Sequence, residues 1–294
     1  MHSQEPGERD LPHELNPPHP LLVEPIVRRA LEEDFGRAGD LTTDLLIPSG
    51  NMARAVIRAR DHGVICGLVA AVPAFRIVDP AIQVQISAPD GSRISAGQVV
   101  AAIGGPARTI LMAERVALNF LGHLSGVATA TNALVSQVAG TNARIICTRK
   151  TIPGLRLLQK YAIRCGGGLN HRFGLDDAIL VKDNHIAAAG GLRPVMSRLR
   201  GQLGPMVKVE VEVDSLAQLE EALALGFDAI LLDNMSPDLM RRAVDITAGR
   251  AVLEASGGIT PDRVRAIAET GVDYISSGAL THSVRSLDLG LDFL

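Results

Sequence analysis

Three cations follow directly on apolar runs, where a charged side chain is unusual. Arg149 and Lys150 come after RIICT, and Lys182 comes after AILV. A charge in such a place is expected only if it faces a site or pairs with a carboxylate. The surrounding segment, 144–182, carries eight basic residues and two acids, a balance of +6; because the whole chain sums to −3, the remainder sums to −9. The three cations therefore predict a site for an anionic ligand.

The pair His171-Arg172 lies between these cations and follows the glycine-rich stretch CGGGLN. Glycine allows a close approach of the backbone, and Arg offers a planar fork that suits a carboxylate or a phosphate. His171 taken alone fits a structural histidine as well as a ligand contact. The remaining basic residues of the segment lie on expected helices or leading edges and are interpreted as solvent-facing: Arg144, Arg156, Lys160 and Arg164.

Two carboxylates end the next apolar runs. Glu212 closes VKVEVEV apart from its last valine, and Asp233 lies in AILLDN. Beside phosphate-binding cations, such carboxylates favour a divalent metal or the hydroxyls of a sugar. Glu210, two residues earlier on the same strand face, could equally belong to the site. The alternative is ion pairing with Lys150 or Lys182.

The last two apolar runs end in small residues that lead into helices. Ser256, Gly257 and Gly258 form one such loop, and Ser277, Gly278 and Ala279 form the other. Thr260-Pro261 supplies an N-cap and an N1 proline after the first loop. Backbone amides at helix starts bind phosphate, so the two loops together predict a phosphate site.

These residues require a repeated β/α arrangement to bring them together. Six short apolar runs beyond Thr141 are typical of buried parallel strands: RIICTRK, AILVKDN, VKVEVEV, AILLDN, AVLEASGG and DYISSG. From Lys182 to Ser277 the polar run ends are 30, 21, 23 and 21 residues apart, the length of compact β/α units. No GxGxxG opens the first unit and nearly every strand ends in a polar residue, which favours a barrel over an open doubly wound sheet.

The first half of the chain has a different pattern. Residues 1–20 are rich in proline, histidine and acid, and we interpret them as a flexible arm. A helix is expected over 21–34, and the runs at 53–60, 62–67, 82–87 and 98–105 predict a small antiparallel layer. A long amphipathic helix is expected over 108–138.

Composition excludes several classes of protein. A chain of 294 residues, 47% apolar and 21% charged, is globular and has the size of one large or two smaller domains. With 3% aromatic residues it lacks the rings on which single-stranded nucleic acid stacks. We find neither a membrane span nor a secretion signal, and so expect a cytoplasmic protein. Cys66, Cys147 and Cys165 show no CxxC spacing and are expected to be buried thiols.

Several motifs resemble those of the quinolinate phosphoribosyltransferases, also called nicotinate-nucleotide pyrophosphorylases (carboxylating). They are TRKTIPGLR, KYAIRCGGGLNHRFGLDDAILVKDNHI, VEVEV, AILLDN, EASGGI and ISSGALTHS, together with AERVALNFLGHLSG before the barrel. The resemblance implies a type II phosphoribosyltransferase with an N-terminal α/β sandwich domain and a C-terminal incomplete α/β barrel. We place the sandwich domain at 21–115 and the barrel at 116–282, with the tail 283–294 packing on the sandwich domain.

The resemblance also implies roles for individual residues. Arg149, His171, Arg172 and Lys182 would bind the two quinolinate carboxylates and neighbouring phosphates, with Thr148 beside them and Lys150 close to the transferring centre. Glu212 and Asp233 would lie near the ribose hydroxyls and Mg²⁺ of phosphoribosyl pyrophosphate, and are, with Lys150, the expected catalytic residues. The loops Ser256, Gly257, Gly258 and Ser277, Gly278, Ala279 would bind phosphate.

Two further expectations concern partners and alternatives. Arg115 matches an arginine that this family contributes across a dimer interface, so the resemblance implies a homodimer with shared active sites, or a higher oligomer built from it. The alternatives are a related transferase acting on nicotinate, a Schiff-base aldolase using Lys150 or Lys182, and a non-catalytic phosphometabolite-binding module.

Overall fold

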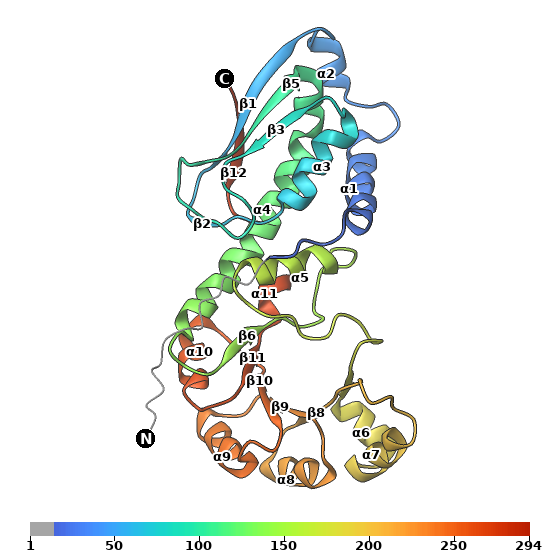
Figure 1. Cartoon of the computed structure of the whole chain (residues 1–294), viewed down its shortest axis with the longest axis vertical. Helices are drawn as coiled ribbons and strands as arrows, with labels where there is room; N and C mark the ends of the chain where they lie inside the picture. The colour runs from blue at the N-terminus through green and yellow to red at the C-terminus, as the bar shows by residue number, and fades with distance from the viewer. Residues whose placement is uncertain (1–14) are drawn as a thin grey trace, which may run out of the picture.

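The computed structural model describes residues 15–294 and has two parts joined by one long helix (Figure 1). The first part contains an antiparallel sheet with helices packed on one of its faces, and the second contains a curved parallel sheet. The predicted combination of an α/β sandwich and an incomplete barrel is confirmed.

The N-terminal part is built around the strand β1, which pairs on both sides. Its sheet has the order β12-β1-β5-β3, and all three pairings are antiparallel. Helices α1, α3 and α4 lie together on one face of this sheet (Figure 1). The elements are α1 (Pro20–Phe35), α2 (Leu41–Leu46), β1 (Met52–Ala59), β2 (Gly63–Val64), α3 (Leu68–Val78), β3 (Gln83–Ile86), β4 (Arg93–Ile94), β5 (Val99–Pro106) and β12 (Leu289–Phe293).

Capping residues explain where two of these helices begin. Asp40 accepts a hydrogen bond from the backbone N–H of Thr43 at 2.9 Å and so starts α2. Asp90 accepts from the N–H of Leu68 at 3.0 Å and satisfies the first turn of α3. Buried apolar side chains of α1, α3 and α4 then form one continuous core with β1 and β5. The expected antiparallel layer is confirmed.

Helix α4 (Ala107–Gln137) is the connection between the two parts. It is continuous over 31 residues, which corresponds to about 46 Å at 1.5 Å per residue. The helix expected over 108–138 is therefore confirmed. The boundary that we placed after residue 115 lies inside this helix, so the chain has no linker there.

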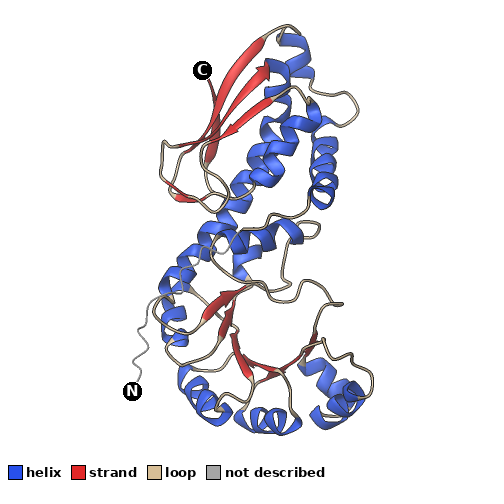
Figure 2. Cartoon of the chain, viewed as in Figure 1, coloured by secondary structure: helices blue, strands red, loops and turns tan. Residues whose placement is uncertain are grey.

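The C-terminal part contains the predicted parallel strands. They are β6 (Arg144–Ile146), β7 (Ile179–Val181), β8 (Val209–Val213), β9 (Ala229–Asp233), β10 (Val252–Ser256) and β11 (Tyr274–Ser276). The order β6-β11-β10-β9-β8-β7 leaves β6 and β7 as the two edges of a sheet that curves without closing. Helices cover its convex side (Figure 2), which distinguishes it from a doubly wound sheet with helices on both faces.

Helices alternate with these strands. They are α5 (Arg156–Cys165), α6 (Asp183–Ala189), α7 (Leu192–Arg200), α8 (Leu216–Leu225), α9 (Pro237–Thr247), α10 (Pro261–Ala268) and α11 (Ala279–His282). Thr260 is the N-cap of α10 and Pro261 its first residue, as the sequence predicts.

The chain returns to its first part at the end. β12 pairs with β1 in antiparallel register from Ala55–Phe293 to Ala59–Leu289. To reach this edge the tail crosses α4 at Gly122 and Gly126, where the backbone of residues 285–287 comes so close that a Cβ on Gly126 would overlap with the Arg285 carbonyl. The tail thus packs on the N-terminal part.

Residues 15–19 precede α1 and belong to the segment that we expected to be a flexible arm. Leu15 packs against the apolar core, and Leu15, Pro17 and Pro18 line a groove together with α1 and α3. Residues 1–14 of the expected arm lie outside the described residues. The three cysteines are free and buried, as expected. No helix between residues 15 and 294 is long and apolar enough to cross a membrane.

Candidate active site

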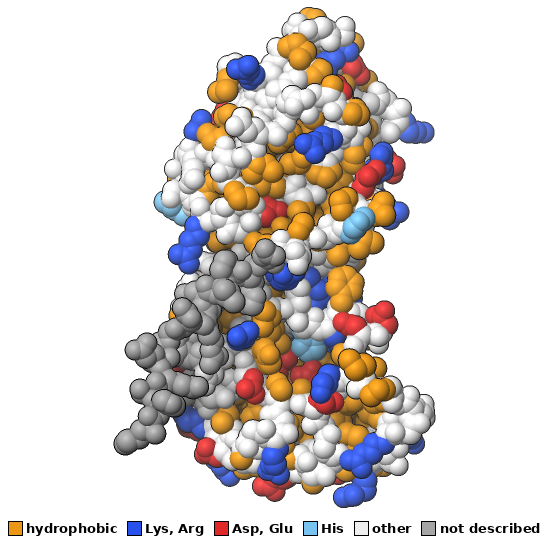
Figure 3. Space-filling view, in the orientation of Figure 1, with side chains coloured by type: hydrophobic (Ala, Val, Ile, Leu, Met, Phe, Trp, Pro, Cys, Tyr) orange, Lys and Arg blue, Asp and Glu red, His pale blue; other side chains and the backbone are white. Residues whose placement is uncertain are grey.

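A cavity of about 490 Å³ opens at the carboxyl ends of the barrel strands. Figure 3 shows side chains of both charges and a histidine gathered on the concave side of this sheet. The cavity is lined by Thr148, Arg149, Lys150, His171, Arg172, Leu180, Lys182, Glu212, Leu231, Asp233, Asn234, Glu254, Ser256, Gly257, Gly258 and Ser276. Parallel strands of a barrel all end at the same mouth, which is why residues far apart in sequence meet here.

Most of the expected site residues are brought together by this cavity. Its lining includes Thr148, Arg149, Lys150, His171, Arg172, Lys182, Glu212, Asp233, Ser256, Gly257 and Gly258. Arg115, Ser277, Gly278 and Ala279 do not line it. Arg115 is exposed on α4, and Ser276, the last residue of β11, lines the cavity where Ser277 was expected.

The two arginines of the cavity have donors left to offer. The Nε atoms of Arg149 and Arg172 are buried and have no hydrogen-bond partner among the described residues. Burial and the neighbouring Arg149 lower the pKa of Arg172, and its Nη1 donates to the Ala178 carbonyl at 3.0 Å. A buried unpaired donor destabilises a fold unless a ligand or water satisfies it. This pair of guanidinium groups is therefore suited to an anion.

The two carboxylates face these cations from β8 and β9. Burial raises the pKa of Glu212, and Asp233 and Asp183 raise it further, while Lys182 and Lys150 oppose the shift. Lys182 Nζ lies 3.8 Å from Glu212 Oε2, so ion pairing with Lys182, one of the alternatives, is present. Asp233 accepts a hydrogen bond from Asn234 Nδ2 at 2.9 Å. Two hard oxygen ligands that repel each other fit a divalent cation such as Mg²⁺.

The loop after β10 is shaped by two glycines in left-handed conformation. Gly257 has φ +90° and Gly258 has φ +58°, values that favour residues without a Cβ. A Cβ on Gly257 would overlap with the Asn234 side chain, and Asn234 itself has a positive φ of 53°. The loop after β10 and the loop after β9 are thus packed tightly against each other next to Asp233.

Lys150 is held by its backbone rather than by its side chain. Its N–H donates to Thr148 Oγ1 at 3.0 Å, and its carbonyl accepts from Thr281 Oγ1 at 2.8 Å. Gly278 borders it, since a Cβ there would lie 2.8 Å from Lys150 Cδ. Gly278 therefore adjoins the site without lining the cavity.

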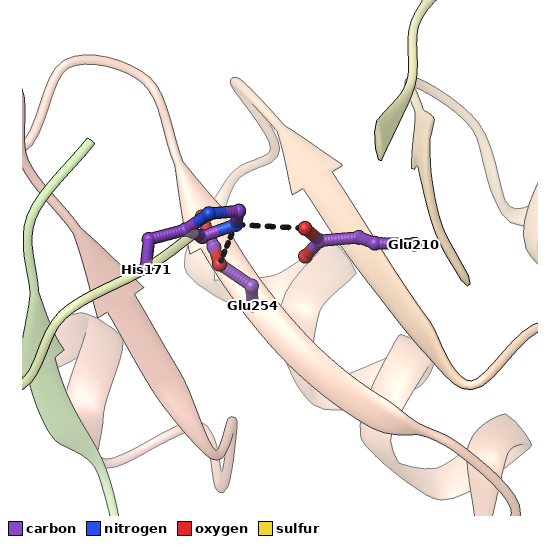
Figure 4. A group of neighbouring side chains, drawn as sticks. All are labelled: His171, Glu210 and Glu254. Carbon is purple, nitrogen blue, oxygen red and sulfur yellow. Dashed lines mark hydrogen bonds and ion pairs between the residues drawn. The ribbon is translucent and has the colours of Figure 1, made fainter. Parts of the chain in front are cut away.

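The floor of the cavity contains a cluster that the sequence analysis only partly anticipated. His171 Nε2 lies 2.8 Å from Glu210 Oε2 and 3.4 Å from Glu254 Oε2 (Figure 4). The sequence indicates Glu210 as a possible member of the site, but our expected site residues do not include Glu254. The available signal was an acid inside an apolar run, AVLEAS, because an acid in a buried strand requires a partner. Asn234 and Ser276 are further lining residues that we did not predict.

One expectation about the basic residues is wrong. Lys160 was expected to face solvent, but it is 2% exposed and donates from Nζ to the His171 carbonyl at 2.8 Å and to Cys147 Sγ at 3.0 Å. Helix α5 is buried on most of its surface, so its polar positions do not mark a solvent face. Arg156 is half-buried and donates to Thr151 Oγ1 and to the Phe173 carbonyl, bracing two loops.

Comparisons with known proteins agree with this architecture. Residues 40–125 match the family model described as the N-terminal domain of quinolinate phosphoribosyl transferase, and residues 127–292 match its C-terminal domain. A nicotinate-nucleotide pyrophosphorylase (carboxylating) of Mycobacterium leprae is 45% identical over 90% of this chain and 95% of its own length. A probable enzyme of the same name from Bacillus subtilis is 42% identical over 92% of this chain and 93% of its own length.

A solved structure extends the likeness to three dimensions. The nicotinate-nucleotide pyrophosphorylase from Francisella tularensis superimposes with a TM-score of 0.91 at 40% identity, and the match covers 95% of this chain and 99% of that chain. Both parts of the molecule therefore have counterparts in one solved chain.

Proposed function

The chain belongs to the quinolinate phosphoribosyltransferase family, and on that premise we propose that it transfers the phosphoribosyl group of phosphoribosyl pyrophosphate to quinolinate. The products are nicotinate mononucleotide, pyrophosphate and CO₂, which places the reaction in NAD biosynthesis. One observation carries the proposal: two arginines, each with a buried Nε that lacks a partner among the described residues, and two carboxylates line the same cavity. An anionic pyridine and a metal-bound pyrophosphate together require both.

Binding of the dicarboxylate is assigned to the cationic half of the cavity. Arg149, Arg172 and Lys182 would each pair with a carboxylate or phosphate oxygen, and Thr148 would contribute a hydroxyl. The amides of Ser256, Gly257 and Gly258 would bind phosphate at the start of the next β/α unit. The site holds the two substrates so that the pyridine nitrogen faces C1 of the ribose.

The transfer step is a substitution at that carbon. The pyridine nitrogen forms a bond to C1 as the bond to pyrophosphate breaks, with positive charge developing on the ribose. Glu212 and Asp233 would hold Mg²⁺ directly or through water, and the ion supplies charge neutralisation for the leaving pyrophosphate. Lys150 and Lys182 add positive charge near the departing phosphates.

The decarboxylation follows from the charge on the ring nitrogen. When the bond between C2 and its carboxylate breaks, the electron pair stays on C2 beside the positively charged nitrogen, and a proton then takes the place of CO₂. Lys150 and its neighbouring cations would orient the ring and exclude water, without a covalent bond to substrate. A lysine with this role is not trapped by borohydride, in contrast to the lysine of a Schiff-base aldolase.

We also propose that Arg115 acts across a dimer interface. It is exposed on α4 and absent from the lining of its own cavity, which leaves it available to a second subunit. A higher oligomer could contain the same dimer. The cytoplasmic location stays a prediction.

The direct test is release of CO₂ from quinolinate labelled at the 2-carboxylate, in the presence of phosphoribosyl pyrophosphate and Mg²⁺. We expect CO₂ and pyrophosphate in equal amounts, no CO₂ when either substrate is omitted, and loss of release after chelation of the metal. Pyrophosphate release with nicotinate at the same rate would favour the alternative substrate. Pyrophosphate without CO₂ would contradict the proposed reaction.

A further inference from the structure

Three titratable side chains lie together at the base of the cavity, where His171 and Glu254 line it and Glu210 contacts His171. Their joint role is not explained by substrate contacts. His171 precedes Arg172 in the loop after α5, Glu210 lies in β8 and Glu254 lies in β10 (Figure 4). Glu210 and Glu254 are buried, at 9% and 4% exposure. Their nitrogen and oxygen atoms lie within 4.8 Å of one another, so the first question is whether they bind a metal.

The hydrogen bonds of His171 favour a proton over a metal. The backbone N–H of Arg172 donates to His171 Nδ1 at 2.7 Å, so Nδ1 is the nitrogen with the lone pair. Nε2 then carries the proton and donates it to Glu210 at 2.8 Å. A histidine that ligates a metal normally donates its other N–H, whereas here the other nitrogen is an acceptor. Nε2 is therefore a donor and not a ligand atom.

The hydrogen bond from the Arg172 N–H to His171 Nδ1 also bears on the charge of His171. Burial lowers the pKa of His171, and Glu210 and Glu254 outweigh this effect and raise it. A second proton on Nδ1 would nevertheless point at the Arg172 N–H across 2.7 Å. This hydrogen bond opposes a second proton on the ring and favours the neutral form with its proton on Nε2.

The surroundings of Glu254 favour its uncharged form at neutral pH. Burial raises its pKa to about 8, and the neighbouring Glu210 raises it further, against the opposing effect of His171. The other charged groups around the cluster are Lys160 from α5, bound to the His171 carbonyl, and Arg172 from the loop. A second cavity lies on the other side of the cluster, away from the mouth of the barrel, and Lys208 and Tyr274 line it.

The pair His171-Arg172 is thus fixed at three points. The His171 carbonyl accepts from Lys160, the imidazole Nε2 donates to Glu210 and lies 3.4 Å from Glu254 Oε2, and the Arg172 N–H donates to the imidazole. The Arg172 side chain starts from this backbone and lines the cavity, and its Nε is buried without a hydrogen-bond partner among the described residues. Any movement of the imidazole would move the amide of Arg172 with it.

We propose that Glu254 is a positioning residue of this site: together with Glu210 it holds His171 in the Nε2–H form and thereby sets the orientation of Arg172 toward an anionic substrate. The inference rests on the proposed function, since it assigns the support of a residue that binds quinolinate. It also explains why a carboxylic acid, neutral at working pH, lies under a cationic cavity. An ionised Glu254 would add a negative charge below the substrate carboxylates and weaken their binding.

The test measures KM and kcat for quinolinate between pH 6.5 and 9.5 in the full-length enzyme. In the wild type, KM is expected to rise as pH passes about 8 and Glu254 ionises. Glu254→Gln carries a neutral side chain of the same shape and should abolish this rise. Glu254→Ala should raise KM roughly tenfold or more at every pH, with a smaller effect on kcat, because His171 loses one support. Glu221→Gln, exposed on α8, is the matched control and should follow the wild type.

Nitrogen-15 spectra of the histidine rings give a second measurement, which does not depend on turnover. His171, assigned from a His171→Asn spectrum, should show a protonated Nε2 and an acceptor Nδ1 in the wild type and a changed pattern in Glu254→Ala. The inference would be overturned if KM of Glu254→Gln rose with pH at the same midpoint as KM of the wild type. A protonated Nδ1 on His171 in the wild type would also overturn it. Absence of CO₂ release by the wild type would instead contradict the proposed function, while the spectra would still decide the tautomer.

Discussion

Glu254 also connects the stability of the fold to pH. Its carboxyl has an ordinary pKa of 4.5, and burial raises this to about 8 in the folded chain. Between these values the folded state holds one proton more than the unfolded state, so this contribution to stability is complete below pH 4.5 and is lost as pH rises through 8. The slope from one such proton is at most about 1.4 kcal/mol per pH unit.

We therefore predict that Glu254→Gln flattens the pH dependence of the free energy of unfolding. Urea unfolding at intervals from pH 5 to pH 8.5 measures this slope in both proteins. The wild type should lose stability relative to Glu254→Gln as pH rises. Parallel curves for the two proteins would mean that Glu254 is ionised in the folded chain.

Gly257 allows a second prediction on the scale of one residue. Replacement by Ala combines backbone strain at φ +90° with overlap between the new Cβ and Asn234, the partner of Asp233. We expect Gly257→Ala to lower kcat/KM at least roughly tenfold. Gly140→Ala is the matched control, because Gly140 has φ +79° and no atom within 4 Å of its added Cβ. Equal kcat/KM in the two variants would contradict the proposed contact between this loop and the substrates.

The predictability of site residues from sequence depends on how local their signal is. Arg149, Lys150 and Lys182 were found because each follows an apolar run directly. The expectation for Lys160 was wrong because its burial arises when α4 and the loop at His171 pack around α5. The local hydrophobic pattern of α5 does not contain this information. Glu254 was missed because its partners come from another strand and a distant loop.

At the level of elements, a shift of one residue changes the face on which a side chain lies. The sequence placed the end of the last strand at Ser277, whereas β11 ends at Ser276 and Ser276 lines the cavity. Side chains of a strand alternate between its two faces, so this single step changes which serine lines the cavity, Ser276 or Ser277. The existence and spacing of all six strands were nevertheless correct, because apolar runs of this length have few alternatives.

The crossing of α4 and the C-terminal tail gives a prediction for two packed elements. A Cβ on Gly126 would overlap with the Arg285 carbonyl, and backbone cannot move aside as a flexible side chain can. We expect Gly126→Ala to lower the free energy of unfolding by roughly 1–3 kcal/mol, the usual effect of overpacking. Urea unfolding measures it. Gly201→Ala, in helical conformation with open space around it, should not share this loss, and equal losses in the two variants would place the strain elsewhere.

On the scale of the whole molecule, the two parts are not independent pieces of chain. Helix α4 packs against elements of both parts within one continuous apolar core, and β12 returns from the barrel to pair with β1. A cut after residue 115 would divide a helix and separate the N-terminal sheet from its edge strand. The sequence could indicate two parts from the change of pattern near residue 141, but not this sharing, because it depends on contacts between the ends of the chain.

The proposed dimer leads to a prediction about which subunit supplies Arg115 to each active site. If Arg115 serves the partner's barrel, Arg115→Ala and Arg172→Ala are each inactive as homodimers for different reasons. In a mixed dimer the barrel of the Arg115→Ala subunit is intact and receives the wild-type Arg115 of the other subunit, while the second barrel lacks both residues. Heterodimers isolated through two different tags should therefore have about half of the wild-type activity, and an equal unsorted mixture about a quarter. CO₂ release measures both values. Inactive heterodimers of confirmed composition would show that Arg115 acts within its own subunit or outside catalysis.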